Sequence, residues 1–242
     1  MAQPNNIEPA RQVAARVVGL LYLLTLASSV FSEMIVMDRL VVPGDALATA
    51  RGIAGAALFF RLGVLADLFT CAGVVALNWG LYVILRPVGR QLALLAAFLR
   101  LVEAAIAGSL IVGSFLVLRL LAKTDDPAAF SPEQLAVLAR AVLGARVSGL
   151  HVAGVLLGLG SAVYGILWWR SGYVPRPLAA LGIVGSLGLV GVTSLVLLFP
   201  SVGPLLNVLY MLPLGLFEVM LGLLLLVGGL RAPASGAPPG PA

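Results

Sequence analysis

The chain has 242 residues, of which 61% are hydrophobic and 10% are charged, whereas a typical soluble domain has about 25% charged residues. Its mean hydropathy of +1.09 is too high for a surface that faces water, so we expect a lipid bilayer to be its solvent. The net charge of +5 comes from arginines at the ends of apolar runs, which suit anionic lipid headgroups and argue against a nucleic-acid partner. A single cysteine and a single histidine exclude an intrachain disulfide and a metal site built from such residues. We expect no metal and no cofactor.

Six apolar runs are long enough for membrane-spanning helices, which need roughly 20 residues each. They cover residues 13–35, 62–85, 92–118, 147–169, 178–199 and 205–230. The predicted fold is therefore an all-α, polytopic transmembrane helical bundle of about six spanning helices, with a single domain over residues 13–230. Segment 1–12 is predicted to be a short cytoplasmic end, and the tail 231–242, rich in proline, glycine and alanine, to be disordered.

The first apolar run follows Arg11 and Arg16, as the core of a signal peptide would. It is too long for such a core, which has about 7–15 residues. We therefore expect an uncleaved first helix. Cleavage after Ser29 is the alternative.

The connections between the spans carry helix start signals. Asp45, after the turn VVPGD, is placed to cap a short helix over residues 46–60, which would lie near the membrane surface or re-enter the bundle. Ser131 and Gln134 form the pattern of a capping box, so a helix is predicted to begin well before the fourth span. Gly144 is the candidate position for a break in that helix.

Small residues recur at three- or four-residue spacing in the fourth and fifth spans: Gly154, Gly158, Ser161 and Gly165, then Gly182, Gly185, Gly188 and Gly191. In lipid, such spacing lets helix backbones approach closely, so it predicts tight packing. Residues 200–204 are predicted to form a tight, uncharged turn. Pro213 is predicted to kink the sixth helix.

Lysine and arginine in the loops bear on orientation. With the N-terminus inside, seven basic residues fall on each side, so their number decides nothing. The inner loops, however, are short and rich in arginine, whereas the outer basic residues are spread over two long loops that also carry acidic residues. This distribution favours a multi-pass protein of the plasma (inner) membrane with both termini in the cytoplasm.

Six ionisable residues lie inside the predicted spans, where they are costly and mark functional sites by default. Helical rise sorts them into two layers. The outer layer holds Glu33, Asp67 and His151, with Arg61 and Arg146 near the same boundary. The middle layer holds Arg100, Glu103 and Glu218. Arg100 and Glu103 are three residues apart and should share a helix face.

Two interpretations of these layers stay open. In the first, they line a polar intramembrane cavity, open outward, that binds or moves a small molecule, a lipid or a proton. In the second, they are ties between helices, because a buried arginine needs a carboxylate partner in any protein. Glu33, Asp67 and His151 could also act as acid–base groups, provided that the three converge.

Four strings resemble one family of prokaryotic integral membrane proteins: RQVAARVVGLLYLL, VVPGDALATARGI, LYVILRPVGRQLALLAAFLRLVEAAI and LHVAGVLLGLGSAVYGILWWRSGYVPRPLAALG. The family is catalogued as domain of unknown function number 4386, and the resemblance runs from about Arg11 to the end of the sixth span. It implies a membrane location and several helices. It implies no established activity, so it assigns no catalytic residue. The residues that match the family are Asp45, Arg86, Arg90, Arg100, Glu103, His151, Arg170 and Pro175, whereas Arg51 stands where asparagine is frequent.

Three classes of function follow. The absence of nucleophile, zinc, phosphate-loop and dinucleotide motifs favours a binding, transport or accessory membrane protein over an enzyme. The first alternative is an intramembrane enzyme that uses Glu33, Asp67 and His151. The second is a structural or regulatory subunit, in a homo-oligomer or with another membrane protein. The bilayer is the expected partner, and the expected ligand is a small molecule or a lipid.

Overall fold

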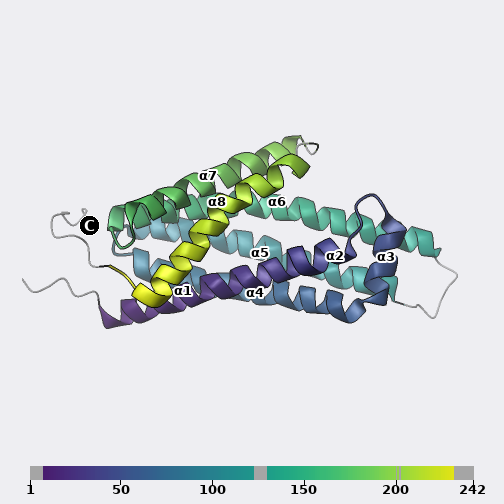
Figure 1. Ribbon diagram of the computed structural model, residues 1–242, viewed down its shortest axis with the longest axis horizontal. Helices are drawn as coiled ribbons and strands as arrows, with labels where there is room; N and C mark the ends of the chain where they lie inside the picture. The colour runs from purple at the N-terminus through teal and green to yellow at the C-terminus, as the bar shows by residue number, and fades with distance from the viewer. Residues whose placement is uncertain (1–7, 123–129, 200, 202, 232–242) are drawn as a thin grey trace, which may run out of the picture. The chain divides into compact units, whose positions relative to one another are not determined.

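The computed structural model is all-helical over the residues that it describes, 8–122, 130–199, 201 and 203–231 (Figure 1). The helical segments are α1 (Pro9–Val30), the π-helical η1 (Phe31–Met37), α2 (Asp38–Leu40), α3 (Ala46–Gly55), α4 (Ala57–Leu85), α5 (Arg90–Leu121), α6 (Pro132–Ser171), α7 (Arg176–Leu198), α8 (Gly203–Leu223) and the π-helical η3 (Leu224–Gly228). Within these ranges the chain has no strand, so the predicted all-α fold class is confirmed.

Five helical runs are long and apolar enough to cross a bilayer: Pro9–Leu40, Ala57–Leu85, Arg90–Leu121, Pro132–Ser171 and Arg176–Leu198. They cover the first five predicted spans to within one residue. The protein is therefore a multi-pass membrane protein. The described apolar part of α8, Leu212–Gly228, is shorter, so the sixth crossing and its kink at Pro213 stay predictions.

Helix α6 is longer than its predicted span requires. Its 40 residues extend about 60 Å at 1.5 Å per residue, twice the hydrocarbon thickness of about 30 Å. It must therefore tilt or begin outside the hydrocarbon. The candidate break at Gly144 is wrong, because α6 runs through it without interruption. The burial of Leu143 and Arg146 on either side offsets the roughly 1 kcal/mol that a glycine costs a helix.

Both predicted start signals are confirmed. The Asp45 carboxylate accepts a hydrogen bond of 2.8 Å from the Ala48 N–H and so caps α3. At the start of α6, the Ser131 N–H donates to the Gln134 side chain at 2.8 Å. The Gln134 N–H donates to the Ser131 hydroxyl at 3.3 Å, which completes a reciprocal capping box.

The predicted end of the short helix at residue 60 is wrong. Helix α3 ends at Gly55, and Ala56 leaves helical geometry with φ −124° and ψ 40°. Phe60 then belongs to the first turn of α4, where it is fully buried. The chain breaks here because glycine is a weak helix former and the change of direction buries an aromatic ring.

Three predictions fall wholly or partly on residues that the structure leaves undescribed. Residues 1–7 of the N-terminal segment, 200 and 202 of the predicted turn, and 232–242 of the predicted disordered tail lie outside the described residues.

Two compact units divide the chain, and α1, α4, α5 and α6 contribute a segment to each. Unit 1 comprises residues 1–26, 73–104 and 151–242, and unit 2 comprises residues 27–72 and 105–150. Unit 1 has its core around the fully buried Trp168 and Leu167. Unit 2 has its core around Phe60, Ile53 and Val36. The single domain over residues 13–230 stays a prediction.

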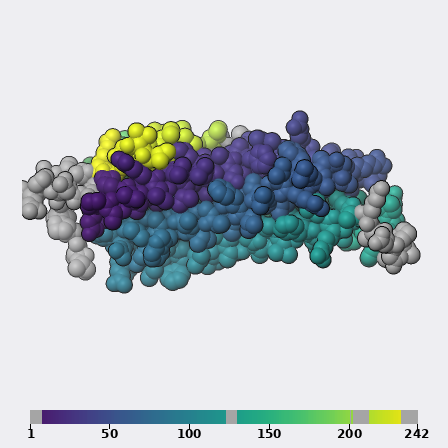
Figure 2. Space-filling view, turned by 90° about the horizontal axis from the view of Figure 1, so that it is seen from below, coloured from purple at the N-terminus to yellow at the C-terminus, as the bar shows by residue number. Residues whose placement is uncertain are grey.

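Glycines let the helices of unit 1 approach closely. A Cβ built on Gly19 of α1 would lie 2.5 Å from the backbone nitrogen of Leu226 in η3. Accordingly, the C-terminal end of the helical chain, in yellow, lies directly against the N-terminal helix, in purple (Figures 1 and 2). A Cβ on Gly158 of α6 would lie 2.7 Å from the carbonyl oxygen of Ser186 in α7. The Gly158 contact confirms the predicted tight packing of α6.

The glycine stripe of α7 is only partly used. Gly182 faces the ring of Phe217, and Gly185 faces the backbone of Leu214, both on α8. Gly188 and Gly191 have no described atom within 4 Å of a built Cβ. The prediction of tight packing is therefore confirmed for the first two glycines of the stripe.

Candidate functional site

An arginine buried in unit 2 bridges two carboxylates from two other helical segments. Arg146 of α6 donates to both carboxylate oxygens of Glu33 in η1, at 3.3 Å from Nη1 and 2.5 Å from Nη2. Its Nη2 also donates to Oδ2 of Asp67 in α4, at 2.8 Å. This is the forked geometry in which a guanidinium binds carboxylates most strongly. We call Arg146, Glu33 and Asp67 the Arg146 cluster.

Local packing brings Glu33 to Asp67. The side chain of Val36, one turn after Glu33, lies against Gly63, one turn before Asp67, where a Cβ would come within 2.8 Å of it. Segment η1 and α4 therefore approach closely beside the cluster. Glu33 lies on a π-helical turn, a rare geometry that occurs frequently at functional sites.

Exposure decreases from one member of the Arg146 cluster to the next. The side chain of Glu33 is 36% exposed, that of Asp67 is 14% exposed and that of Arg146 is 7% exposed. A guanidinium buried this deeply is stable only with carboxylates and complete hydrogen bonding. The cluster supplies two carboxylates and three hydrogen bonds to them, so it has the geometry of an interhelical tie.

The predicted outer layer is found in part. Glu33 and Asp67 lie together, but one guanidinium binds both of them. His151 belongs to unit 1, so its convergence with the two carboxylates stays a prediction. Arg61 is exposed. The acid–base enzyme hypothesis thus has two of its three groups in one place.

A second buried arginine, Arg100 of α5, lies in unit 1 with 5% exposure. Its Nη1 is 3.2 Å from Oε2 of Glu103, one turn further along, which confirms the predicted shared face. Glu218 of α8, Tyr22 of α1 and Tyr164 of α6 lie within electrostatic range of the same guanidinium. We call these five residues the Arg100 cluster.

A glycine of α6 makes room for the arginine of this cluster. A Cβ on Gly160 would lie 2.8 Å from Cγ of Arg100. The aliphatic stem of the arginine therefore packs directly on the α6 backbone. Any side chain larger than hydrogen at position 160 would move the guanidinium.

Hydrogen bonding in the Arg100 cluster is incomplete within the described residues. Nη1 of Arg100 and Oε2 of Glu103 are buried without a hydrogen-bond partner, although they form an ion pair. The Tyr164 hydroxyl donates to the backbone oxygen of Asn78 at 3.4 Å, and Oδ1 of Asn78 is also buried without a partner. Since buried polar atoms are nearly always paired, this cluster has spare hydrogen-bonding capacity that the Arg146 cluster lacks.

The donor chemistry of both clusters is that of charge pairing. Among the described residues, no group of three or more His, Cys, Asp or Glu side chains is arranged to hold a metal ion. Each cluster instead sets one guanidinium against two carboxylates.

Comparison with known proteins places the chain in a family. Residues 17–229 match the family described as a domain of unknown function (DUF4386). The chain belongs to the DUF4386 family. No curated protein and no solved structure matches it. Both clusters lie within the matched residues of this DUF4386 protein.

Sequence reasoning missed the central place of Arg146, because it was assigned to a helix boundary. Its position 14 residues inside an uninterrupted α6 would have identified it, had the continuity of that helix been clear. Tyr22 and Tyr164 were missed for another reason. A tyrosine in an apolar run is usually part of the core, and only the fold brings these two hydroxyls within electrostatic range of Arg100.

Proposed function

We propose that this membrane protein binds and moves protons, and that Glu218 is the acceptor at which the proton is held. The observation that carries the proposal is the composition of the Arg100 cluster. The charged groups that act on Glu218 are Arg100 and Glu103. One guanidinium thus compensates two carboxylates.

The imbalance matters because the cluster is largely withdrawn from solvent: Arg100 is buried, and Glu103 and Glu218 are half-buried. Ionising both carboxylates would leave one uncompensated negative charge, and the penalty for a buried ion is several kcal/mol. A proton on one carboxylate removes that charge. Glu103 is already in contact with the guanidinium, so Glu218 is the better proton acceptor.

Proton exchange also needs groups that can pass the proton on. The hydroxyls of Tyr22 and Tyr164 are electrostatically coupled to the cluster from α1 and α6. Intramembrane chains of carboxylates and neighbouring polar groups are the usual relays of proton pumps and transporters. Four helices therefore contribute to one candidate relay in unit 1.

In contrast to the Arg100 cluster, the Arg146 cluster has the hydrogen bonding expected of a structural element. It has the same ratio of charges, but its guanidinium donates hydrogen bonds to both carboxylates. Glu33 is also partly exposed, which lowers the cost of its charge. We assign this cluster to the stability of unit 2.

The location that fits this function is the plasma (inner) membrane, with both termini in the cytoplasm. Several helix ends meet at one end of unit 1 (Figure 1), and we call it the basic end because seven arginines lie at or near these helix ends: Arg11, Arg16, Arg86, Arg90, Arg170, Arg176 and Arg231. Hydrogen bonds hold it together. Arg11 donates to the carbonyl oxygen of Ile84 at 3.0 Å and to the Tyr173 hydroxyl at 2.7 Å, and Arg231 N–H donates to the Tyr173 carbonyl oxygen at 3.1 Å. Clustered arginines beside a membrane span favour the cytoplasmic side.

Infrared difference spectroscopy of the purified full chain tests the proton acceptor. A protonated carboxyl group has a carbonyl band separate from that of a carboxylate. At neutral pH we expect such a band in the wild type, its loss in Glu218→Gln, and its persistence in the control Glu133→Gln, whose carboxylate is exposed at the start of α6. A band that survives Glu218→Gln and disappears in Glu103→Gln would overturn the assignment.

A further inference from the structure

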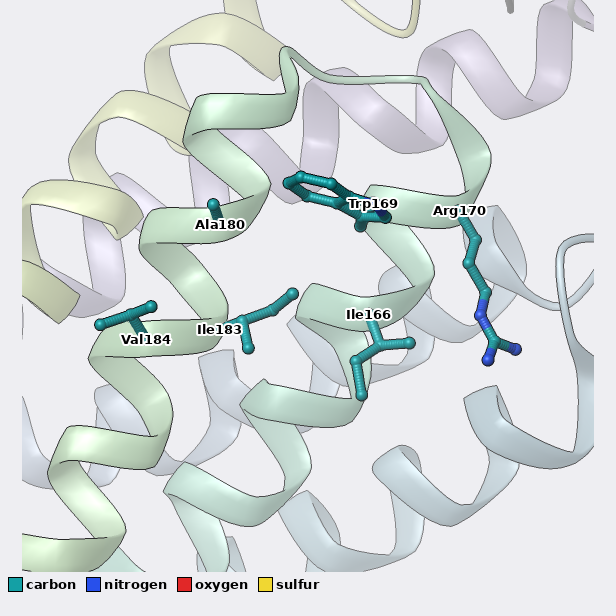
Figure 3. A pocket seen from close by; sticks show the side chains of 6 residues that line it. All are labelled: Ile166, Trp169, Arg170, Ala180, Ile183 and Val184. Carbon is teal, nitrogen blue, oxygen red and sulfur yellow. The ribbon is translucent and has the colours of Figure 1, made fainter. Parts of the chain in front are cut away.

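An open apolar groove lies on unit 1 between the C-terminal turns of α6 and the N-terminal turns of α7 (Figure 3). Its volume is about 280 Å³, and Ile166, Trp169, Ala180, Ile183 and Val184 line it together with Arg170. The aliphatic residues come from both helices, and the Trp169 ring closes the end nearest the loop between them. This volume lies at the lower limit of small-molecule sites, which are about 300–1,000 Å³, so the groove suits part of a long apolar chain.

An arginine lies beside the closed end of this groove. The guanidinium carbon of Arg176 lies 5.9 Å from the centre of the Trp169 ring. Arg170 follows Trp169 in the chain, and its side chain extends from the end of α6 on the side away from the groove (Figure 3). Both arginines belong to the basic end. Among the described residues of the basic end, Glu8 is the only acidic one.

We propose that this groove binds an anionic phospholipid, with part of one acyl chain between α6 and α7 and the phosphate against Arg176. The apolar lining matches the acyl chain, and Arg176 beside the Trp169 ring matches the headgroup in charge and position. Tryptophan near the end of a membrane-spanning helix, as Trp169 is in α6, is typical of the boundary between acyl chains and headgroups. A cluster of arginines beside a span attracts anionic headgroups by about 1 kcal/mol for each residue near the surface.

Charge complementarity selects the anionic class. A zwitterionic lipid could place its chain in the groove equally well, but its headgroup brings no net charge to the basic end. The lipid groove does not involve Glu218, so a result against lipid binding leaves the proposed proton acceptor untouched, and the reverse also holds.

Quenching of Trp169 fluorescence by brominated lipid tests the proposal. The full chain, carrying Trp79→Phe, would be reconstituted in phosphatidylcholine vesicles that contain increasing fractions of brominated phosphatidylglycerol or brominated phosphatidylcholine. Trp79 is 68% exposed and would add background, whereas Trp168 is fully buried and should report little. We expect phosphatidylglycerol to quench at lower mole fractions than phosphatidylcholine.

Substitutions at the arginine and in the groove distinguish the contribution of the lipid headgroup from that of the acyl chain. Arg176→Gln should weaken the preference for phosphatidylglycerol about fivefold, the equivalent of one lost arginine contact, and Arg176→Lys should retain most of it. Ala180→Phe should fill the groove and reduce quenching by both lipids. The control is Arg119→Gln, which removes an exposed arginine of unit 2 and should change nothing.

Three results would overturn the proposal. The first is equal quenching by the two lipids in the wild type. The second is an effect of Arg176→Gln no larger than that of Arg119→Gln. Reversal of the preference by inorganic phosphate at concentrations that leave vesicles intact would also overturn it, because the arginines would then bind free phosphate rather than a lipid.

Discussion

The same set of charges occurs twice in this protein with different hydrogen bonding. Arg146 meets Glu33 and Asp67 through three hydrogen bonds. Arg100 meets Glu103 in an ion pair whose closest atoms have no hydrogen-bond partner among the described residues. A buried arginine that donates hydrogen bonds to both of its carboxylates is expensive to disturb, whereas the ion pair of Arg100 engages Glu103 and leaves Glu218 as the candidate proton acceptor. The difference in geometry therefore separates a tie from a candidate functional site.

Removing the guanidinium of the tie should destabilise unit 2. In Arg146→Gln, two carboxylates lose their compensating charge, and breaking a buried pair in this way costs about 3–5 kcal/mol. The loss should appear as a lower midpoint of thermal unfolding for the purified protein in detergent.

A triple variant distinguishes a tie from a functional arginine. Arg146→Gln combined with Glu33→Gln and Asp67→Asn removes all the charges and keeps polar side chains of similar size. We expect it to recover most of the stability lost by the single variant, because no uncompensated charge remains. If the triple variant were as unstable as the single one, the interpretation as a tie would be wrong.

Among the helices and their connections, what could be predicted depends on how local each signal is. The capping residues Asp45 and Ser131 act within three residues of themselves, and both were predicted correctly. The continuity of α6 through Gly144 was not, because burial on both sides of the glycine depends on other helices. The end of α3 was misplaced for the same reason, since Phe60 joins α4 in order to reach the core of unit 2.

Glycine contacts between helices give a prediction with a matched control. In Gly158→Ala of α6, the new methyl group would lie 2.7 Å from the Ser186 carbonyl oxygen, and overpacking of this kind typically costs about 1–3 kcal/mol. In Gly188→Ala of α7, no described atom lies within 4 Å. Alanine there should be neutral or stabilise the helix by roughly 0.5–1 kcal/mol.

Thermal unfolding in one detergent measures both glycine variants. The expected order of midpoints is Gly188→Ala at or above the wild type, and Gly158→Ala below it. Equal midpoints for the two variants would contradict the close contact of α6 and α7 in unit 1.

For the whole molecule, hydropathy was sufficient to predict a membrane location, but it could not predict how the ionisable residues pair. The apolar runs are contiguous in sequence, so five of the predicted spans are found as long helices. The hydrogen bonds that define the Arg146 cluster and the basic end join residues far apart in the chain, with separations of 113 residues between Arg146 and Glu33 and 162 between Arg11 and Tyr173. Sequence could nominate the six ionisable residues by their cost in lipid. It could not assign their partners, because partner choice depends on which helices pack together.

Proton movement across vesicle membranes tests the central claim most directly. Full-length protein would be reconstituted in vesicles that contain a pH-sensitive dye, and a potassium diffusion potential, negative inside, would drive protons inward. We expect the wild type and Glu133→Gln to acidify the vesicle interior faster than protein-free vesicles do, and Glu218→Gln to match the protein-free rate. Equal rates for the wild type and Glu218→Gln, at equal amounts of reconstituted protein, would contradict the assignment of Glu218 as the proton acceptor.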